Sequence, residues 1–139
     1  MSKQVPRQVN WQPISSLPFI ASMIDGMAGE AEQQHANLEG CRSKPYVLDD
    51  TTVERLLKVF VEQAEYLPIY EEQLSRWKDL TLDPPQRREV ERLAAQLPKL
   101  RERIASILTL AQELKQGTIE SVLAKSDIEL GMDSLLKRR

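Results

Sequence analysis

The sequence has few of the side chains from which catalytic and metal sites are built. Its 139 residues include one histidine, His35, and one cysteine, Cys41. A zinc site needs three or four nitrogen or sulfur ligands, which one chain cannot supply from this pair. With a single cysteine no internal disulfide can form, which is typical of proteins in reducing compartments.

Motifs of common enzymes are missing too. The chain has no glycine-rich phosphate loop and no dinucleotide-binding fingerprint. Cys41 follows a predicted helix C-terminus, where the helix dipole disfavours a thiolate. The pairs Asp49–Asp50 and Glu71–Glu72 are explained by helix capping and by a solvated face. We therefore predict that the protein is not an enzyme and holds no cofactor.

Long apolar runs and excess charge of one sign are lacking. No run approaches the roughly 18–20 apolar residues of a membrane span, and the first residues, MSKQVPRQVN, do not read as a secretory signal. The formal net charge is −2, which gives no global reason to expect nucleic acid or an anionic membrane as partner. These absences predict a cytoplasmic protein without a membrane partner.

Glycine is scarce, and β-branched residues form no alternating run, whereas good helix formers dominate from residue 50 onward. The predicted fold class is therefore all-α. Apolar residues at spacings of three and four predict long helices at about 17–39 and 53–80, and a third from Pro84 to the residues before Gly117.

One or two short helices are expected after Gly117, the first capped by Thr118 and the second by the SDIE pattern at 126–129. Residues 1–15 are predicted to be an extended N-terminal arm, and 16–139 a single domain. The expected architecture is an antiparallel three-helix bundle built on a long proline-kinked hairpin, because a short turn joins the second and third helices.

The two helices of the hairpin each contain an internal proline, Pro68 and Pro98, at a cost of about 3 kcal/mol apiece. Each lies fifteen residues from Asp83 in the turn, so the two are level in an antiparallel hairpin. We interpret them as a static bend that follows the first helix. The alternatives are a hinge, or one helix that ends at its proline.

The hairpin tip and a second apolar stripe on the second helix exceed what the shorter first helix can cover. Exposed apolar patches of this kind indicate a protein partner or self-association, and a homodimer is the expected form. The alternative is that the arm folds back and Trp11 covers the tip. The candidate interface residues are Tyr66, Tyr70, Trp77, Leu80 and Leu82.

Four basic residues lie on one stripe of the third helix, at steps of four, seven and four: Arg88, Arg92, Lys99 and Arg103. We call them the basic stripe. It is a candidate surface for an anionic partner, nucleic acid included. Interspersed glutamates and the lack of interleaved aromatic residues favour a solvated face instead.

The segment EQQH places Glu32 and His35 at the spacing found in di-iron bundles. A second such motif cannot exist with one histidine, so we expect His35 to be hydrogen-bonded across to the second helix. The favoured function is a non-enzymatic helical module that binds protein, itself included. The alternatives are a nucleic-acid-associated regulator that uses the basic stripe, and a metal-binding bundle around Glu32 and His35.

Overall fold

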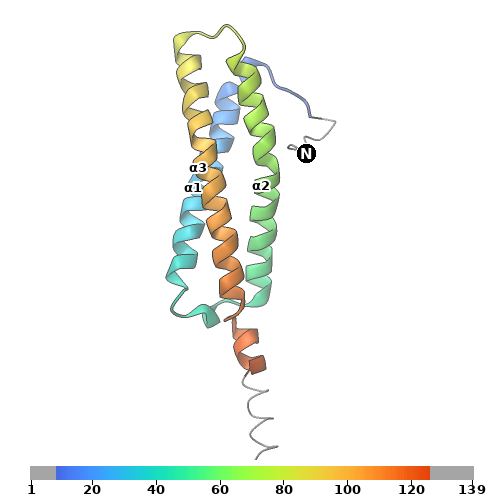
Figure 1. Ribbon diagram of the computed structural model, residues 1–139, viewed down its shortest axis with the longest axis vertical. Helices are drawn as coiled ribbons and strands as arrows, with labels where there is room; N and C mark the ends of the chain where they lie inside the picture. Colours follow the sequence, from blue (N-terminus) through green and yellow to red (C-terminus); the bar gives the residue numbers. More distant parts are fainter. Residues whose placement is uncertain (1–8, 126–139) are drawn as a thin grey trace, which may run out of the picture.

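The computed structural model describes residues 9–125, and this part of the chain contains only helices, turns and extended segments. Three long antiparallel helices lie side by side, as Figure 1 shows, which confirms the predicted fold class. The helices are η1 (Ile14–Ser16), α1 (Leu17–Gly40), η2 (Pro45–Val47), α2 (Asp50–Lys78) and α3 (Pro84–Lys115), followed by a short helical segment at 119–125.

Local capping fixes where the two longest helices begin. The Asp49 side chain accepts a hydrogen bond from the Thr52 backbone N–H at 2.7 Å, and Asp83 forms a capping box with Gln86. Pro84 occupies the first turn of α3, where its missing N–H costs nothing. Only residues 79–83 separate α2 from α3, so the two helices form the expected hairpin.

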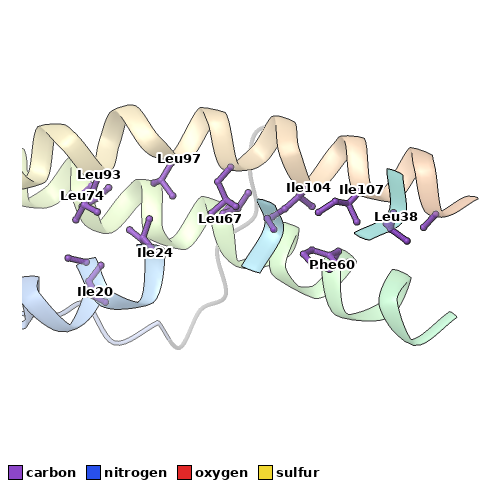
Figure 2. Close-up of a cluster of buried hydrophobic side chains, with 14 of the residues drawn as sticks. Ile20, Ile24, Leu38, Phe60, Leu67, Leu74, Leu93, Leu97, Ile104 and Ile107 are labelled. Carbon is purple, nitrogen blue, oxygen red and sulfur yellow. The ribbon is translucent and has the colours of Figure 1, made fainter. Parts of the chain in front are cut away.

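The core runs along the whole bundle and draws side chains from all three helices (Figure 2). On α2, fully buried residues recur every seven positions, which is the repeat of one helix face. They are Val53, Phe60, Leu67 and Leu74. The third helix buries the most: Val90, Leu93, Leu97, Leu100, Ile104, Ile107, Leu110, Ala111 and Leu114.

The helix α3 is the shared partner of the other two. It packs along both α1 and α2, whereas α1 and α2 approach each other far less closely. This explains the wide apolar face of α3, because a helix that touches two neighbours needs a broader stripe than one that touches a single neighbour.

Both internal prolines lie inside continuous helices. The helix α2 runs on through Pro68 and α3 runs on through Pro98, so neither helix ends at its proline.

Thr118 caps the segment after α3, as predicted. Its Oγ1 accepts a hydrogen bond from the Ser121 backbone N–H at 3.4 Å. The second predicted short helix, at 126–129, lies outside the described residues.

Candidate interaction surfaces

A cluster of ion pairs joins α1 to α3 at the basic stripe. The Arg92 guanidinium donates to both carboxylate oxygens of Asp25, at 3.0 and 2.9 Å, and its Nε donates to Glu89 at 2.8 Å. The hydrogen bonds from Arg92 lower the pKa of Asp25 and of Glu89 below their usual values. In turn, these two carboxylates raise the pKa of Arg92.

Arg103 of the same stripe is engaged as well. Its Nε donates to Glu32 of α1 at 2.9 Å. Arg92, Lys99, Arg103 and Glu32 line one open groove of about 360 Å³ between α1 and α3. The two arginines in this groove are held by carboxylates of their own chain, which weakens their attraction for an outside anion. The use of the stripe by an anionic partner stays a prediction.

Glu32 and His35, the candidate metal ligands, both contact the guanidinium of Arg103. Arg103 Nη1 lies 3.2 Å from His35 Nδ1, and because arginine can only donate, Nδ1 is the acceptor. The expected hydrogen bond from His35 to the second helix is therefore wrong: the partner belongs to α3. Within residues 9–125, no three His, Cys, Asp or Glu side chains gather closely enough to hold a metal ion.

The Arg92 cluster predicts a component of stability that disappears in acid. Because the pKa values of Asp25 and Glu89 are lowered by folding, their contribution is present above the unfolded-state values of about 4 and lost as the pH falls through the lower folded-state values. We expect Arg92→Met to destabilise the fold by less than about 1 kcal/mol at pH 7, since all three side chains are partly exposed.

Urea unfolding of wild type and Arg92→Met between pH 7 and pH 2 measures this contribution. The difference in unfolding free energy between the two proteins should shrink as the pH falls. Arg88→Met is the matched control, because Arg88 makes no ion pair within the described part of the chain. A difference that stays constant with pH would show that Arg92 acts through packing of its aliphatic part.

The arm covers the tip of the hairpin on the α2 side. Trp77 is 1% exposed, and its Nε1–H donates to the Gln12 backbone carbonyl at 3.0 Å. The Gln12 backbone N–H donates to the Gln73 side chain at 2.7 Å, and the Arg76 guanidinium lies 4.3 Å from the centre of the Trp11 ring. The arm of the same chain thus takes the place that a partner at Trp77 would need.

The other four residues of the predicted interface differ in their exposure to solvent. Tyr66 is 57% exposed and Leu80 is also exposed, whereas Tyr70 and Leu82 are half-buried. Burial, with a smaller effect of the neighbouring Tyr66, raises the pKa of the Tyr70 phenol. Without Trp77 as its anchor, this surface consists of two tyrosines on α2 and two leucines at the turn.

At the opposite end of the bundle, η2 and the residues around it contact the segment that follows α3. We call this contact the joint. The Ile119 backbone N–H donates to the Leu48 carbonyl at 2.9 Å, and the buried Thr118 hydroxyl donates to the Asp50 carboxylate at 2.6 Å. Gly117 lies so close to η2 that an added Cβ would stand 2.6 Å from Pro45 Cγ. These contacts hold residues 117–119 against η2, Leu48 and the first residue of α2.

Large apolar side chains are exposed around this joint. Figure 1 shows the segment 119–125 beyond the ends of α1 and α2, at the same end as η2. We call the following five residues the end patch: Tyr46, Val47, Ile119, Val122 and Leu123, of which Val47 is 61% and Leu123 57% exposed. Sequence reasoning missed this surface, although Ile119, Val122 and Leu123 stand at helical spacings of three and four.

No known family model, curated protein or solved structure matches this chain. Across residues 9–125, none of the helices is both long enough and apolar enough to cross a membrane.

Proposed function

We propose that the protein is a non-enzymatic, cytoplasmic helical module that acts by binding protein. The observation that carries the proposal is the end patch. Within residues 9–125, five of the eleven large apolar side chains that are exposed gather at this one end of the bundle. The other six are spread over α1, α2 and the turn after α2.

An apolar surface of this kind is suited to a protein partner. Clustered exposed apolar groups mark interaction sites, and the free energy of binding comes mainly from their removal from water. Two grooves along α1 and α3, of about 360 and 410 Å³, are open to solvent, and each is lined in part by charged side chains that already bind one another. Small-molecule sites are usually more enclosed than these grooves.

Site-specific photo-crosslinking in the native cells tests the proposal. A photoreactive amino acid at Val47 is expected to give protein adducts on irradiation. The same group at Val61 is the matched control, because Val61 is also an exposed valine but lies on α2 away from the end patch. No more adduct from Val47 than from Val61 would overturn the proposal.

A third position separates the two candidate surfaces. Tyr66 is the most exposed member of the interface predicted on α2. Adducts from Tyr66 and none from Val47 would move the binding surface to that flank of the hairpin. Adducts from Val47 alone would support the end patch.

A further inference from the structure

The arm binds α2 through its backbone. The Gln12 backbone N–H donates to Gln73 Oε1 at 2.7 Å, and Gln73 Nε2 donates to the Gln12 backbone carbonyl at 3.3 Å. The Trp77 Nε1–H donates to the same carbonyl at 3.0 Å. One side-chain amide therefore pairs with both backbone groups of a single residue, and every residue except proline carries such a pair of groups.

The Gln12 side chain takes no part in these hydrogen bonds to α2. Its Nε2 donates to the Asn10 carbonyl at 2.9 Å, and its Oε1 accepts from the Ser16 hydroxyl at 3.3 Å. Both partners lie within four residues of Gln12 in the chain. The helix α2 thus hydrogen-bonds to the backbone at this position and not to the side chain.

The preceding residue supplies a side chain that α2 does contact. The Trp11 ring centre lies 4.3 Å from the Arg76 guanidinium, which is a cation–π contact. The Arg76 Nε also pairs with Glu72, one turn earlier in α2, at 3.2 Å. Pro13 follows Gln12 with an extended backbone, and a residue before proline itself favours extended conformations. The surface therefore accepts an aromatic side chain followed by an extended backbone.

The α2 side of this contact is suited to a peptide. Gln73 is one of two polar side chains that are buried within residues 9–125. In the same range, the arm is the only hydrogen-bond partner of the Gln73 amide and of the Trp77 indole. Because buried amide and indole groups need hydrogen-bond partners, the two side chains are complementary to a bound peptide backbone.

The arm is a small occupant of this surface. It is held on α2 at Trp11 and Gln12, which are half-buried, whereas Asn10 and Pro13 on either side are exposed. A segment that buries so little of its surface opens at a low cost in free energy. The arm of a second copy would gain no contact that it lacks at its own site, which favours a different protein as the source of a replacing peptide.

We propose that Gln73, Arg76 and Trp77 form a peptide-binding site, the arm site, which the arm occupies until a partner displaces it. The partner is another protein that presents an extended segment, with an aromatic residue directly before the residue that pairs with Gln73. The inference goes beyond the proposed function, since the arm site lies at the hairpin tip and the end patch at the opposite end of the bundle (Figure 1).

A fluorescently labelled peptide with the sequence of residues 9–16, VNWQPISS, tests the arm site by anisotropy against the full-length chain. The double variant Trp11→Ala/Gln12→Pro weakens the chain's own arm, because it removes the ring and the N–H. We expect the peptide to bind this variant, and to bind wild type at least about tenfold more weakly, because a tethered arm competes at a high effective concentration.

A third substitution locates the binding. Gln73→Met, added to the double variant, should abolish peptide binding, since methionine has a similar length but cannot pair with both backbone groups. Circular dichroism checks that both variants keep their helices.

Substitutions in the peptide test recognition without any change to the protein. Gln12→Ala in the peptide should change the dissociation constant by no more than about threefold, because α2 pairs with the backbone there. Gln12→Pro should raise it by about tenfold or more, because the loss of the N–H leaves the buried Gln73 Oε1 unpaired.

Each outcome decides the inference. Binding that follows this order supports it. No binding to a folded double variant overturns it, as does equal affinity for the double variant and wild type. A Gln12→Ala peptide that binds as weakly as the Gln12→Pro peptide overturns it as well, because recognition would then depend on the side chain. A wild-type dimer that the peptide dissociates would make the arm of a second copy the partner, which also overturns it.

Discussion

Replacing Trp77 by alanine is expected to lower the free energy of unfolding by about 3–5 kcal/mol. Trp77 is among the largest fully buried side chains of the described core, and its removal would leave a cavity between α2 and the arm. The substitution would also remove the hydrogen bond that the Gln12 backbone carbonyl accepts from Trp77 Nε1. Urea unfolding followed by circular dichroism measures the change.

Trp77→Phe is the control that separates volume from hydrogen bonding. Phenylalanine keeps much of the apolar volume but has no N–H, so we expect a loss of about 1 kcal/mol from the hydrogen bond plus a smaller cavity term. Gln12 would keep the hydrogen bond from Gln73 Nε2, at 3.3 Å. If Trp77→Ala left stability unchanged but dissociated a dimer, Trp77 would belong to an interface, as the sequence first suggested.

The helices could be predicted from sequence because their signals are local. The caps at Asp49 and Asp83 act within three residues, as the hydrogen bonds to Thr52 and Gln86 show. The apolar spacing of α2 and α3 repeats over many turns, so a single misleading residue does not change the period. Pro68 and Pro98 did not end their helices, because packing along α3 supports the helix on both sides of each proline.

The contacts between distant segments could not be predicted in the same way. Gln12 and Trp77 are 65 positions apart, and nothing in the arm's sequence specifies the carbonyl that the indole binds. The partner of His35 depends on which helix α1 packs against, and α1 packs along α3, where Arg103 lies. Periodicity shows that a face is buried but not which helix covers it.

The end patch was missed for a related reason. Its residues come from two short segments, 45–47 and 119–125, neither of which is long enough to show a clear period. They become one surface only through the Leu48–Ile119 hydrogen bond and the close approach of Gly117 to Pro45. The contact between the two segments is a tertiary feature, which neither segment specifies on its own.

Because α3 packs along both other helices, we expect a substitution in its buried face to destabilise the whole bundle. Ile107 is fully buried, and Figure 2 shows it near the same end of the core as Leu38 and Phe60. Ile107→Ala is expected to lower the unfolding free energy by about 2–5 kcal/mol. Leu108→Ala is the neighbouring control, and its loss should be clearly smaller because Leu108 is only half-buried.

Two probes decide whether this loss is global. Both tryptophans, Trp11 and Trp77, lie at the tip, so fluorescence reports that end, whereas circular dichroism reports all helices. Ile107 lies 24 residues after Asp83 and Trp77 six before it, which separates them by about 27 Å along the hairpin. In Ile107→Ala the two unfolding curves should still coincide and shift together. A fluorescence curve that keeps the wild-type midpoint would show that the tip and the end of α3 unfold separately, against a single core organised by α3.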